Sequence, residues 1–207
     1  MHQPDTERLL NRAAAGDDAA RGALLVRHRD RLRRMVAVRL DPRLAARVDP
    51  SDVVQETLAE ADRRLNDYLL EQPLPFYPWL RQLASERLGA EYRRHVRAAR
   101  RSVGREEQPV ELPEGSVMAL ADRLMDRGTG PSEAARREEG RERVRLALAR
   151  LPPPEREVLA LRYLEELSAR EVAAVLGVGE EAAKKRALRA LRRLQELLTP
   201  HGLGGGP

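Results

Sequence analysis

The sequence predicts an all-α protein made of two small helical domains joined by a flexible linker. Apolar residues recur at helical spacing, every three to four positions, over most of the 207-residue chain. Aromatic residues make up only 3% and isoleucine is absent, so strand-forming runs are scarce. A stretch with scattered glycine and proline, 102–132, separates two helical blocks at 5–101 and 133–199. The glycine-rich residues 200–207 are expected to form a disordered tail.

Four helices are expected in the first block. A glycine followed by an aspartate separates the first two. The third begins with Asp49 as a capping residue, Pro50 at the first helical position and Asp52 in the first turn. The segment 71–78 contains three prolines, so it is not expected to be helical. The expected helices span Thr6–Ala15, Asp18–Leu40, Asp49–Leu65 and Trp79–Arg101.

The second block is expected to begin with two helices, Glu133–Arg150 and Glu155–Leu164, which three prolines separate. The linker before it holds one short segment with helical spacing, Val117–Met125. Two further helices follow Leu164 and meet at a glycine-containing turn. This pattern predicts a helix-turn-helix at the end of the chain.

Capping residues mark the limits of this helix-turn-helix. Ser168 and Glu171 have the spacing of a capping box at the start of its first helix. Gly177 can take the left-handed conformation that ends this helix, and the second helix is expected to begin near Gly179.

The second helix of the motif has two contrasting faces. Residues 184–193 hold six basic side chains and no acid. A basic face suits phosphates and base edges in the major groove of DNA. An ordinary surface helix of a bundle is the alternative interpretation, but a solvated face usually mixes the two signs of charge. The expected core side is Ala183, Ala187, Leu191, Leu194 and Leu198, and the far side is Lys185, Arg186, Arg189, Arg192 and Arg193.

The overall charge also favours a nucleic-acid partner. The net charge is +5, and only Lys184 and Lys185 among the 38 Lys and Arg residues are lysines. Arginine binds phosphate through a fixed fork of donors. A GC-rich genome, whose codons favour arginine, is an alternative explanation of the bias.

Several classes of protein are not expected. Without cysteine there is no disulfide framework or cysteine-ligated metal, and the four histidines are scattered without metal-ligand spacing. No nucleophile motif or phosphate-binding loop is present, so neither an enzyme nor a cofactor is expected. No signal peptide occurs and no apolar run approaches the roughly 18 residues of a membrane span. The chain is therefore expected to be soluble and cytoplasmic, with no membrane partner.

Two parts of the chain resemble bacterial sigma factors. The stretch "LPPPEREVLALRYLEELSAREVAAVLGVGEEAAKKRALRALRRLQELL" resembles their promoter-binding domain, region 4. The stretches "VDPSDVVQETLAEADRRLNDY" and "PWLRQLASERLGAEYRRHVRAARR" resemble region 2, the polymerase-binding and promoter-melting domain. Because nothing else of domain size is present, the chain resembles the small extracytoplasmic-function (ECF) group. The resemblance covers about Thr6–Leu198 and assigns region 2 to 5–101 and region 4 to 133–199.

The resemblance implies a polymerase-binding surface on the helix that begins at Asp49. In the family this helix grips a coiled coil on the largest polymerase subunit. From the residues alone, positions 52, 55, 56 and 60 form a polar stripe. A capped amphipathic helix with aspartate at its positive end is the alternative. The implied polymerase-binding residues are Asp49, Asp52, Gln55 and Glu56.

The resemblance places recognition of the minus-ten element on the helix after Trp79 and on the proline-rich loop before it, which in the family holds a flipped base. Single-stranded DNA is bound by cations along the backbone and aromatic rings under the bases. A core position is the alternative for Phe76 and Trp79. The chain has Glu86 and Ala90 where the family usually has Asn and Asp, which leaves the minus-ten sequence open. The implied residues are Phe76, Tyr77, Arg87, Tyr92, Arg93, Arg94 and Arg97.

Recognition of the minus-thirty-five element is implied for the helix beginning at Glu180. Its first turns would present side chains to the major groove, and Arg170 on the preceding helix would touch phosphate. The family often has Ser or Thr where Gly179 stands. The implied residues are Arg170, Glu181, Lys184, Lys185, Arg186 and Arg189.

The resemblance implies a sigma factor that joins core RNA polymerase, through the largest-subunit coiled coil and the flap, and directs initiation at specific promoters. An anti-sigma factor is left open as a further partner. A helix-turn-helix regulator that does not join polymerase is the main alternative, and a helical scaffold that binds only proteins is another. A regulator would need an N-terminal sensor or receiver domain, whereas residues 1–101 predict helices only.

Overall fold

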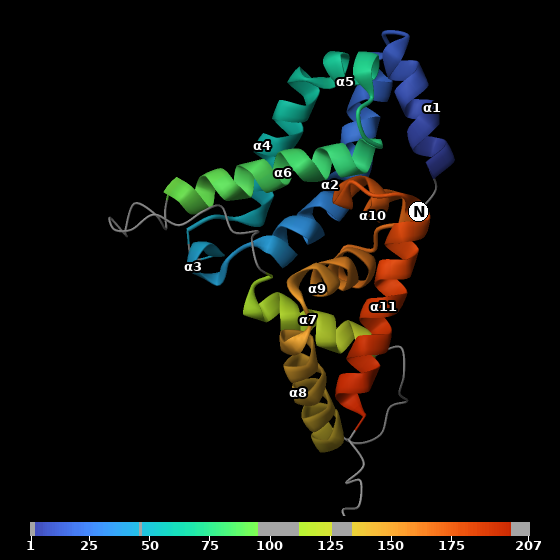
Figure 1. Ribbon diagram of the computed structural model, residues 1–207. Coiled ribbons are helices and arrows are strands. Elements are labelled where there is room, and N and C mark those ends of the chain that lie inside the picture. The colour runs from blue at the N-terminus through green and yellow to red at the C-terminus, as the bar shows by residue number, and fades with distance from the viewer. Residues whose placement is uncertain (1–2, 46, 95–111, 126–133, 200–207) are drawn as a thin grey trace, which may run out of the picture. The chain divides into compact units, whose positions relative to one another are not determined.

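The computed structural model describes residues 3–45, 47–94, 112–125 and 134–199 and divides the chain into two compact units, 1–113 and 114–207 (Figure 1). Within the described residues every regular element is a helix and none is a strand. The predicted all-α class is therefore confirmed. The predicted tail, Arg97 and the rest of 95–111 lie outside the described residues.

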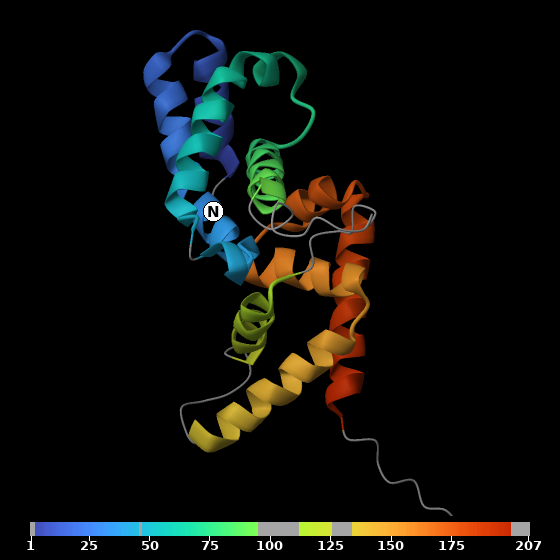
Figure 2. The same cartoon turned by 90° about the vertical axis from the view of Figure 1, so that its left-hand side faces the viewer.

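The first unit is built around one long helix, α2. This helix packs against α1, α4 and α6, and α1, α2 and α4 run side by side in both views (Figures 1 and 2). Its buried side chains include Leu24, Leu32 and Met35, which form the centre of the core. The helices are α1 (Gln3–Ala14), α2 (Asp18–Arg39), α3 (Pro42–Ala45), α4 (Pro50–Arg63), α5 (Leu65–Glu71) and α6 (Phe76–Tyr92).

Aspartate caps set the start of two of these helices. The side chain of Asp17 accepts a hydrogen bond from the Ala20 N–H at 3.0 Å, directly after Gly16 turns the chain with φ 87°. Asp49 accepts from the Ser51 N–H at 2.6 Å at the start of α4. Each carboxylate satisfies a helix N–H that lacks an intrahelical partner. The predicted starts of α2 and α4 are confirmed.

The expectation that 71–78 contains no helix is wrong at both ends, because Glu71 is the last residue of α5 and α6 begins at Phe76. Pro75 is the capping residue, and Phe76, Tyr77 and Pro78 form the first turn. A proline is tolerated there because the N–H that it lacks would have no intrahelical acceptor.

The second unit is arranged around α11, which packs against α8, α9 and α10 (Figure 1). The core of this unit includes Leu148, Leu159 and Leu161. The elements are α7 (Glu114–Met125), α8 (Ala134–Arg150), α9 (Pro153–Leu159), the π-helical turn η2 (Ala160–Leu164), α10 (Ala169–Leu176) and α11 (Glu180–Leu198).

Helix α7 agrees with the short helix expected at Val117–Met125 within the predicted linker 102–132, and it begins three residues earlier, at Glu114. The helix packs on α8 and η2 (Figure 2). Its side chains Val117, Leu120 and Ala121 are buried. An ion pair between Arg141 of α8 and Asp122, with an N–O distance of 2.6 Å, supports this packing. The second unit therefore begins at α7 and not at 133. The apolar spacing of 117–125 predicted a helix, but the glycines and prolines on both sides favoured assigning it to a linker.

The helix-turn-helix has the predicted caps. Ser168 and Glu171 form a complete capping box. The Glu171 N–H donates to the Ser168 hydroxyl oxygen at 3.2 Å, and the Ser168 N–H donates to the Glu171 carboxylate at 2.8 Å. Gly177 ends α10 with φ 62°, and Gly179 precedes α11. The predicted helix 155–164 differs in its second half, which is the π-turn η2. Its wider turn is closed by the Glu165 N–H, which donates to the Ala160 carbonyl at 3.0 Å.

Candidate functional site

The exposed face of α4 carries the polar residues predicted to bind polymerase. Asp52, Gln55 and Glu56 are exposed, whereas Val53 and Val54 on the other face are buried. Asp49 is also at the surface, but its carboxylate is engaged as the cap of α4. Three of the four predicted residues thus lie together on the exposed face of α4, which Ala59 shares. The name "α4 face" is used below for Asp52, Gln55 and Glu56.

Arg87, which was predicted to bind minus-ten DNA, is instead connected to the α4 face. Its guanidinium forms an ion pair with Glu56, and its Nε lies 4.0 Å from Glu91. Helices α4 and α6 pack together, so this pair joins the two predicted surfaces. No sequence pattern could reveal this pair, because the two residues lie 31 positions apart on different helices.

The outward stripe of α6 is formed by other residues. Gln82, Glu86 and Arg93 are exposed, whereas Leu83 and Leu88 are buried. Arg93 follows α6 directly, in a π-type turn, and its guanidinium lies close to Gly89. Arg94 is also exposed, and its guanidinium donates to the buried Glu91 at 3.0 Å. Among the predicted minus-ten cations that the structure describes, Arg87 and Arg94 are paired with carboxylates, whereas Arg93 forms no ion pair with a described residue.

Two of the predicted stacking residues belong to the core. Phe76 and Tyr77 are only 3% and 2% exposed. The Phe76 ring lies 5.4 Å from that of Tyr68 and 5.6 Å from that of Trp79, measured between centroids. The guanidinium of Arg31 lies 3.7 Å from the Tyr77 ring centroid, and the Tyr77 hydroxyl donates to the Arg31 carbonyl at 3.3 Å. No base can stack on the Phe76 or Tyr77 ring, because neighbouring aromatic rings and the Arg31 guanidinium pack against them in the core. The core position considered for Phe76 and Trp79 is the one observed.

Tyr92 keeps a partly exposed ring. Arg43 of α3 donates to its hydroxyl at 3.2 Å and lies 5.5 Å from its ring centroid. The same arginine donates to Asp41, which raises the pKa of Arg43 and lowers that of Asp41. This places a cation beside the only predicted stacking ring that is not buried. No sequence pattern points to Arg43, because it lies 49 residues before Tyr92.

The start of α11 carries charges that neutralise one another. The Lys184 ammonium lies 2.7 Å from Glu181 and 3.0 Å from Glu180. The bond between Lys184 and Glu181 lowers the pKa of Glu181 and raises that of Lys184. Glu181 and Lys184, both predicted to read DNA, are exposed, but their charges are paired with each other within the helix.

The remaining basic residues of α11 divide into two groups. Arg193 turns toward α9, where its guanidinium lies 3.1 Å from Glu155. The others have no carboxylate within 4 Å in the described part of the chain, and Arg170 of α10 shares this property. Of the predicted basic face, Arg193 is paired with a carboxylate. The remaining members are Lys185, Arg186, Arg189 and Arg192. On the other side, Ala183 and Leu194 are buried as predicted, together with Ala190, which the predicted core stripe omitted.

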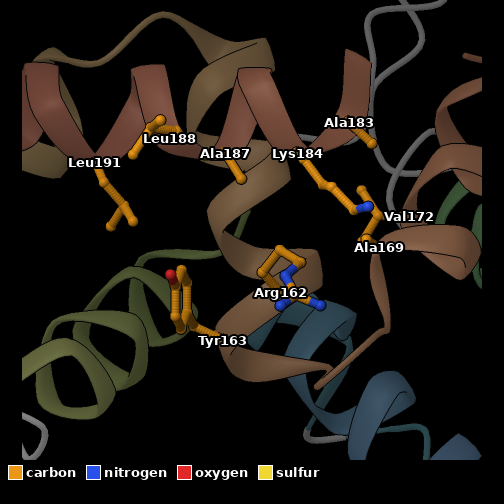
Figure 3. A pocket seen from close by; sticks show the side chains of 9 residues that line it. All are labelled: Arg162, Tyr163, Ala169, Val172, Ala183, Lys184, Ala187, Leu188 and Leu191. Atoms are coloured by element: carbon orange, nitrogen blue, oxygen red, sulfur yellow. The ribbon is translucent and has the colours of Figure 1, made fainter. Parts of the chain in front are cut away.

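An apolar pocket of about 210 Å³ lies between η2, α10 and α11. Ala187 and Leu191 of α11 face Tyr163 and Arg162 of η2 across it (Figure 3). Arg162 is held in place by donating to the Leu167 carbonyl. No sequence motif predicted this pocket, because the π-turn η2 determines where the two η2 side chains point.

Among residues 3–45, 47–94, 112–125 and 134–199 the structure brings no three potential metal ligands together. None of the helices in these ranges combines the length and the hydropathy that a membrane crossing requires.

A helix-turn-helix whose second helix carries basic side chains without a carboxylate partner among the described residues is typical of DNA-binding transcription proteins. The family model "Sigma-70, region 4" matches residues 141–194, which include the whole helix-turn-helix. The RNA polymerase sigma factor CnrH of Cupriavidus metallidurans is 31% identical over 201 residues, covering 96% of this chain and 97% of CnrH. The structure of CnrH in complex with the cytosolic domain of CnrY matches with a TM-score of 0.52 and 27% identity, over 94% of this chain and 97% of CnrH.

Two longer relatives match nearly the whole chain as well. The probable RNA polymerase sigma factor RfaY of Xanthomonas campestris is 29% identical over 92% of this chain. The ECF RNA polymerase sigma factor BldN of Streptomyces coelicolor is 28% identical over 92%. The chain spans 44% of the length of RfaY and 64% of that of BldN. The chain belongs to the RNA polymerase sigma factors of the ECF group. Because the matches extend over both units, they do not support a regulator with a separate sensor domain.

Proposed function

We propose that the chain binds core RNA polymerase as its sigma subunit and directs initiation at promoters that it contacts at the minus-ten and minus-thirty-five elements. The observation that carries this proposal is the match with CnrH along 97% of that protein, which includes both the α4 face and α11. A protein with this role acts in the cytoplasm, where polymerase and DNA are found.

The α4 face is the proposed polymerase contact. Its three polar side chains are exposed on a rigid helix whose apolar face is buried in the unit core. Acidic groups on such a face suit a partner with basic residues, and complementary charge gives specificity and a fast encounter. The pair between Glu56 and Arg87 holds this surface beside α6. Polymerase binding and minus-ten binding would therefore use two faces of one packed helix pair.

The basic face of α11 is the proposed minus-thirty-five contact. Arg186 lies in the first two turns, where a side chain can reach a base edge in the major groove. Arg189 and Arg192 follow on later turns and suit the phosphates beside the groove. Arg170, exposed on α10, adds a cation on the preceding helix. One end of α11 would thus read sequence and the rest would supply charge.

The minus-ten contact is proposed for the outward stripe of α6, which is formed by Gln82, Glu86 and Arg93, together with Tyr92. Single-stranded DNA needs cations for its backbone and a ring surface for its unstacked bases. Arg93 and Arg43 supply cations within the described residues, and Tyr92 supplies a partly exposed ring. Phe76 and Tyr77 take no part in this proposal because they are buried.

An anti-sigma factor is a further proposed partner. The structure matched by this chain has CnrH bound to the cytosolic domain of CnrY. The apolar pocket between η2 and α11, with Leu188 49% exposed at its edge, is a surface that such a partner or polymerase could cover.

Two matched substitutions test the polymerase contact. Asp52 and Asp67 are both exposed, both in the first turn of a helix, and neither has a carboxylate-binding partner in the described residues. Asp52→Arg is expected to abolish recovery of core polymerase with the tagged protein, since a like charge in an interface costs several kcal/mol. Asp67→Arg, which makes the same charge change on α5, is expected to leave recovery unchanged. Equal recovery with both variants would contradict the assignment of the α4 face.

A further inference from the structure

Helix α7 lies outside the part of the second unit that the family model matches. The match begins at residue 141, within α8, whereas α7 ends at Met125. In the second unit α7 packs on α8 and on η2 (Figure 2). The helix-turn-helix has caps of its own at Ser168 and Gly177. Helix α7 is therefore an addition to the matched domain, and it covers a surface to which α8 and η2 contribute.

The contacts that hold α7 in place combine a short apolar face with exposed ion pairs. Val117, Leu120 and Ala121 are buried. Side chains at both ends of α7 form ion pairs with α8 and with the residue two positions after η2. The pairs include Glu114–Arg145, Asp122–Arg141 and Arg123–Glu166, whose side chains are between 24% and 84% exposed. Exposed ion pairs add little net stability, so these pairs set the position of α7 without fixing it strongly.

Helix α7 is too short to be stable by itself. It has 12 residues, and helices shorter than about 12–15 residues are marginal in water. Its helical form therefore depends on the surface beneath it. That surface approaches α7 closely at its last residue, because a Cβ added at Gly140 of α8 would lie 2.8 Å from Cε of Met125. Release of α7 from α8 and η2 would thus unfold it and expose a surface shaped for a helix.

The surface under α7 adjoins the apolar pocket beside α11, because η2 contributes to both. Arg162 and Tyr163 of η2 line the pocket (Figure 3), and η2 also packs on α7. The pocket of about 210 Å³ is larger than the roughly 150 Å³ cavity that holds benzene, so it can accept a large apolar side chain. A helix that binds in a groove uses several such anchors, spaced about three or four residues apart. The pocket by itself provides for one anchor, and α7 occupies the neighbouring surface of η2.

We infer that α7 is an autoinhibitory helix: it fills in cis a helix-binding surface on α8 and η2, to which an amphipathic helix of core RNA polymerase binds after displacing α7. This inference rests on the proposed function, which makes polymerase the partner. The competing helix would place apolar side chains where Val117 and Leu120 lie and another in the adjoining pocket. Its carboxylates would face Arg141 and Arg145, as those of α7 do. The affinity of the free chain for polymerase would be reduced in proportion to the fraction of molecules in which α7 is released.

The test compares the affinities of full-length variants for core RNA polymerase. Asp122→Arg brings two cations together at Arg141 and is expected to release α7. If α7 is docked in about nine molecules of ten, its release raises the affinity about tenfold. The double variant Asp122→Arg with Arg141→Asp restores opposite charges and is expected to lose this gain. The control is Glu139→Arg, which makes the same charge change at an exposed site of α8 and is expected to leave the affinity unchanged.

A crosslink provides the opposite perturbation and does not depend on the folding of Asp122→Arg. The chain has no cysteine, so Met125→Cys with Gly140→Cys can be joined by a short thiol-reactive crosslinker. The linked protein, in which α7 stays docked, is expected to bind polymerase at least about tenfold more weakly than the same variant left unlinked.

A folded Asp122→Arg protein that binds polymerase no more tightly than the wild type would overturn the inference, because a purely structural helix gives no gain on release. Equal affinities of the linked and unlinked proteins would overturn it as well. If neither the wild type nor Asp122→Arg binds polymerase, the proposed function fails, and the inference fails with it. Binding by the wild type without a gain in Asp122→Arg contradicts only the inference.

Discussion

Three arginines on α11 should contribute to DNA binding in three different ways. Arg186 and Arg192 are exposed and have no carboxylate partner in the described residues, whereas Arg193 lies 3.1 Å from Glu155. Each is changed to alanine in the full-length protein. The three substitutions remove the same group, so differences between them report position and pairing.

The magnitudes follow from these surroundings. Arg186→Ala should relax preference at one minus-thirty-five base pair by about 1–3 kcal/mol, or about five- to 150-fold in relative affinity. Arg192→Ala should weaken binding to all sequences alike and reduce the salt slope by about 0.9, the loss of one phosphate contact. Arg193→Ala should change neither quantity, because Glu155 already neutralises this guanidinium.

The assay measures the affinity of each variant for minus-thirty-five duplexes that differ by single base pairs, between about 50 and 200 mM salt. If Arg186→Ala loses affinity equally on every duplex, α11 supplies charge and does not read sequence. If Arg193→Ala lowers the salt slope as much as Arg192→Ala, the pair with Glu155 opens on binding and the reasoning from that pair is refuted.

Three predictions concern stability, each measured by unfolding of the full chain. Ser168→Ala should cost about 1 kcal/mol by removing the capping box of α10, and an unchanged melting temperature would show that the cap is dispensable. Leu24→Ala, at a site with 0% exposure, should cost about 2–5 kcal/mol, whereas Leu70→Ala, 85% exposed, should change stability by less than about 0.5 kcal/mol. The Ala20 N–H and Arg12 lower the pKa of Asp17, so this carboxylate stabilises the fold above its unfolded pKa of about 4 and loses that effect as the pH falls through the lowered pKa. The stability difference between wild type and Asp17→Asn should therefore shrink below about pH 4, and a constant difference would contradict the lowered pKa of this carboxylate.

The helices that were predicted well have local signals at both ends. Ser168, Glu171 and Gly177 act on the backbone within one turn of themselves, so their effect can be read from sequence. The same is true of Asp17 and Asp49. These signals gave the start of α2 and α4 and the turn of the helix-turn-helix.

The sequence could not predict what depends on contacts between distant helices. The burial of Phe76 and Tyr77 depends on Tyr68 and Arg31, which come from α5 and α2. The pairs of Glu56 with Arg87 and of Arg193 with Glu155 likewise join different helices. A charge or ring that looks available in sequence can therefore be engaged in the structure. Whether Phe76 and Tyr77 lie in the core or are free to stack on a base could be decided only from the packed structure of the first unit.

Helix α7 illustrates an intermediate case. The apolar positions Val117, Leu120 and Ala121 were visible as one face, but nothing in the sequence indicated a surface for them. The structure supplies that surface from α8 and η2. The π-turn of η2 also had no sequence signal, because its residues favour an ordinary α-helix equally well.

The most direct test of the central claim is transcription reconstituted from purified components. Core RNA polymerase is mixed with the full chain and a promoter library, and transcripts are counted with and without the chain. We predict transcripts that start at defined promoters only when the chain is present, and that disappear with Asp52→Arg but persist with Asp67→Arg. Promoter-specific transcripts that are unaffected by Asp52→Arg, or no transcripts with the folded wild-type chain, would contradict the account.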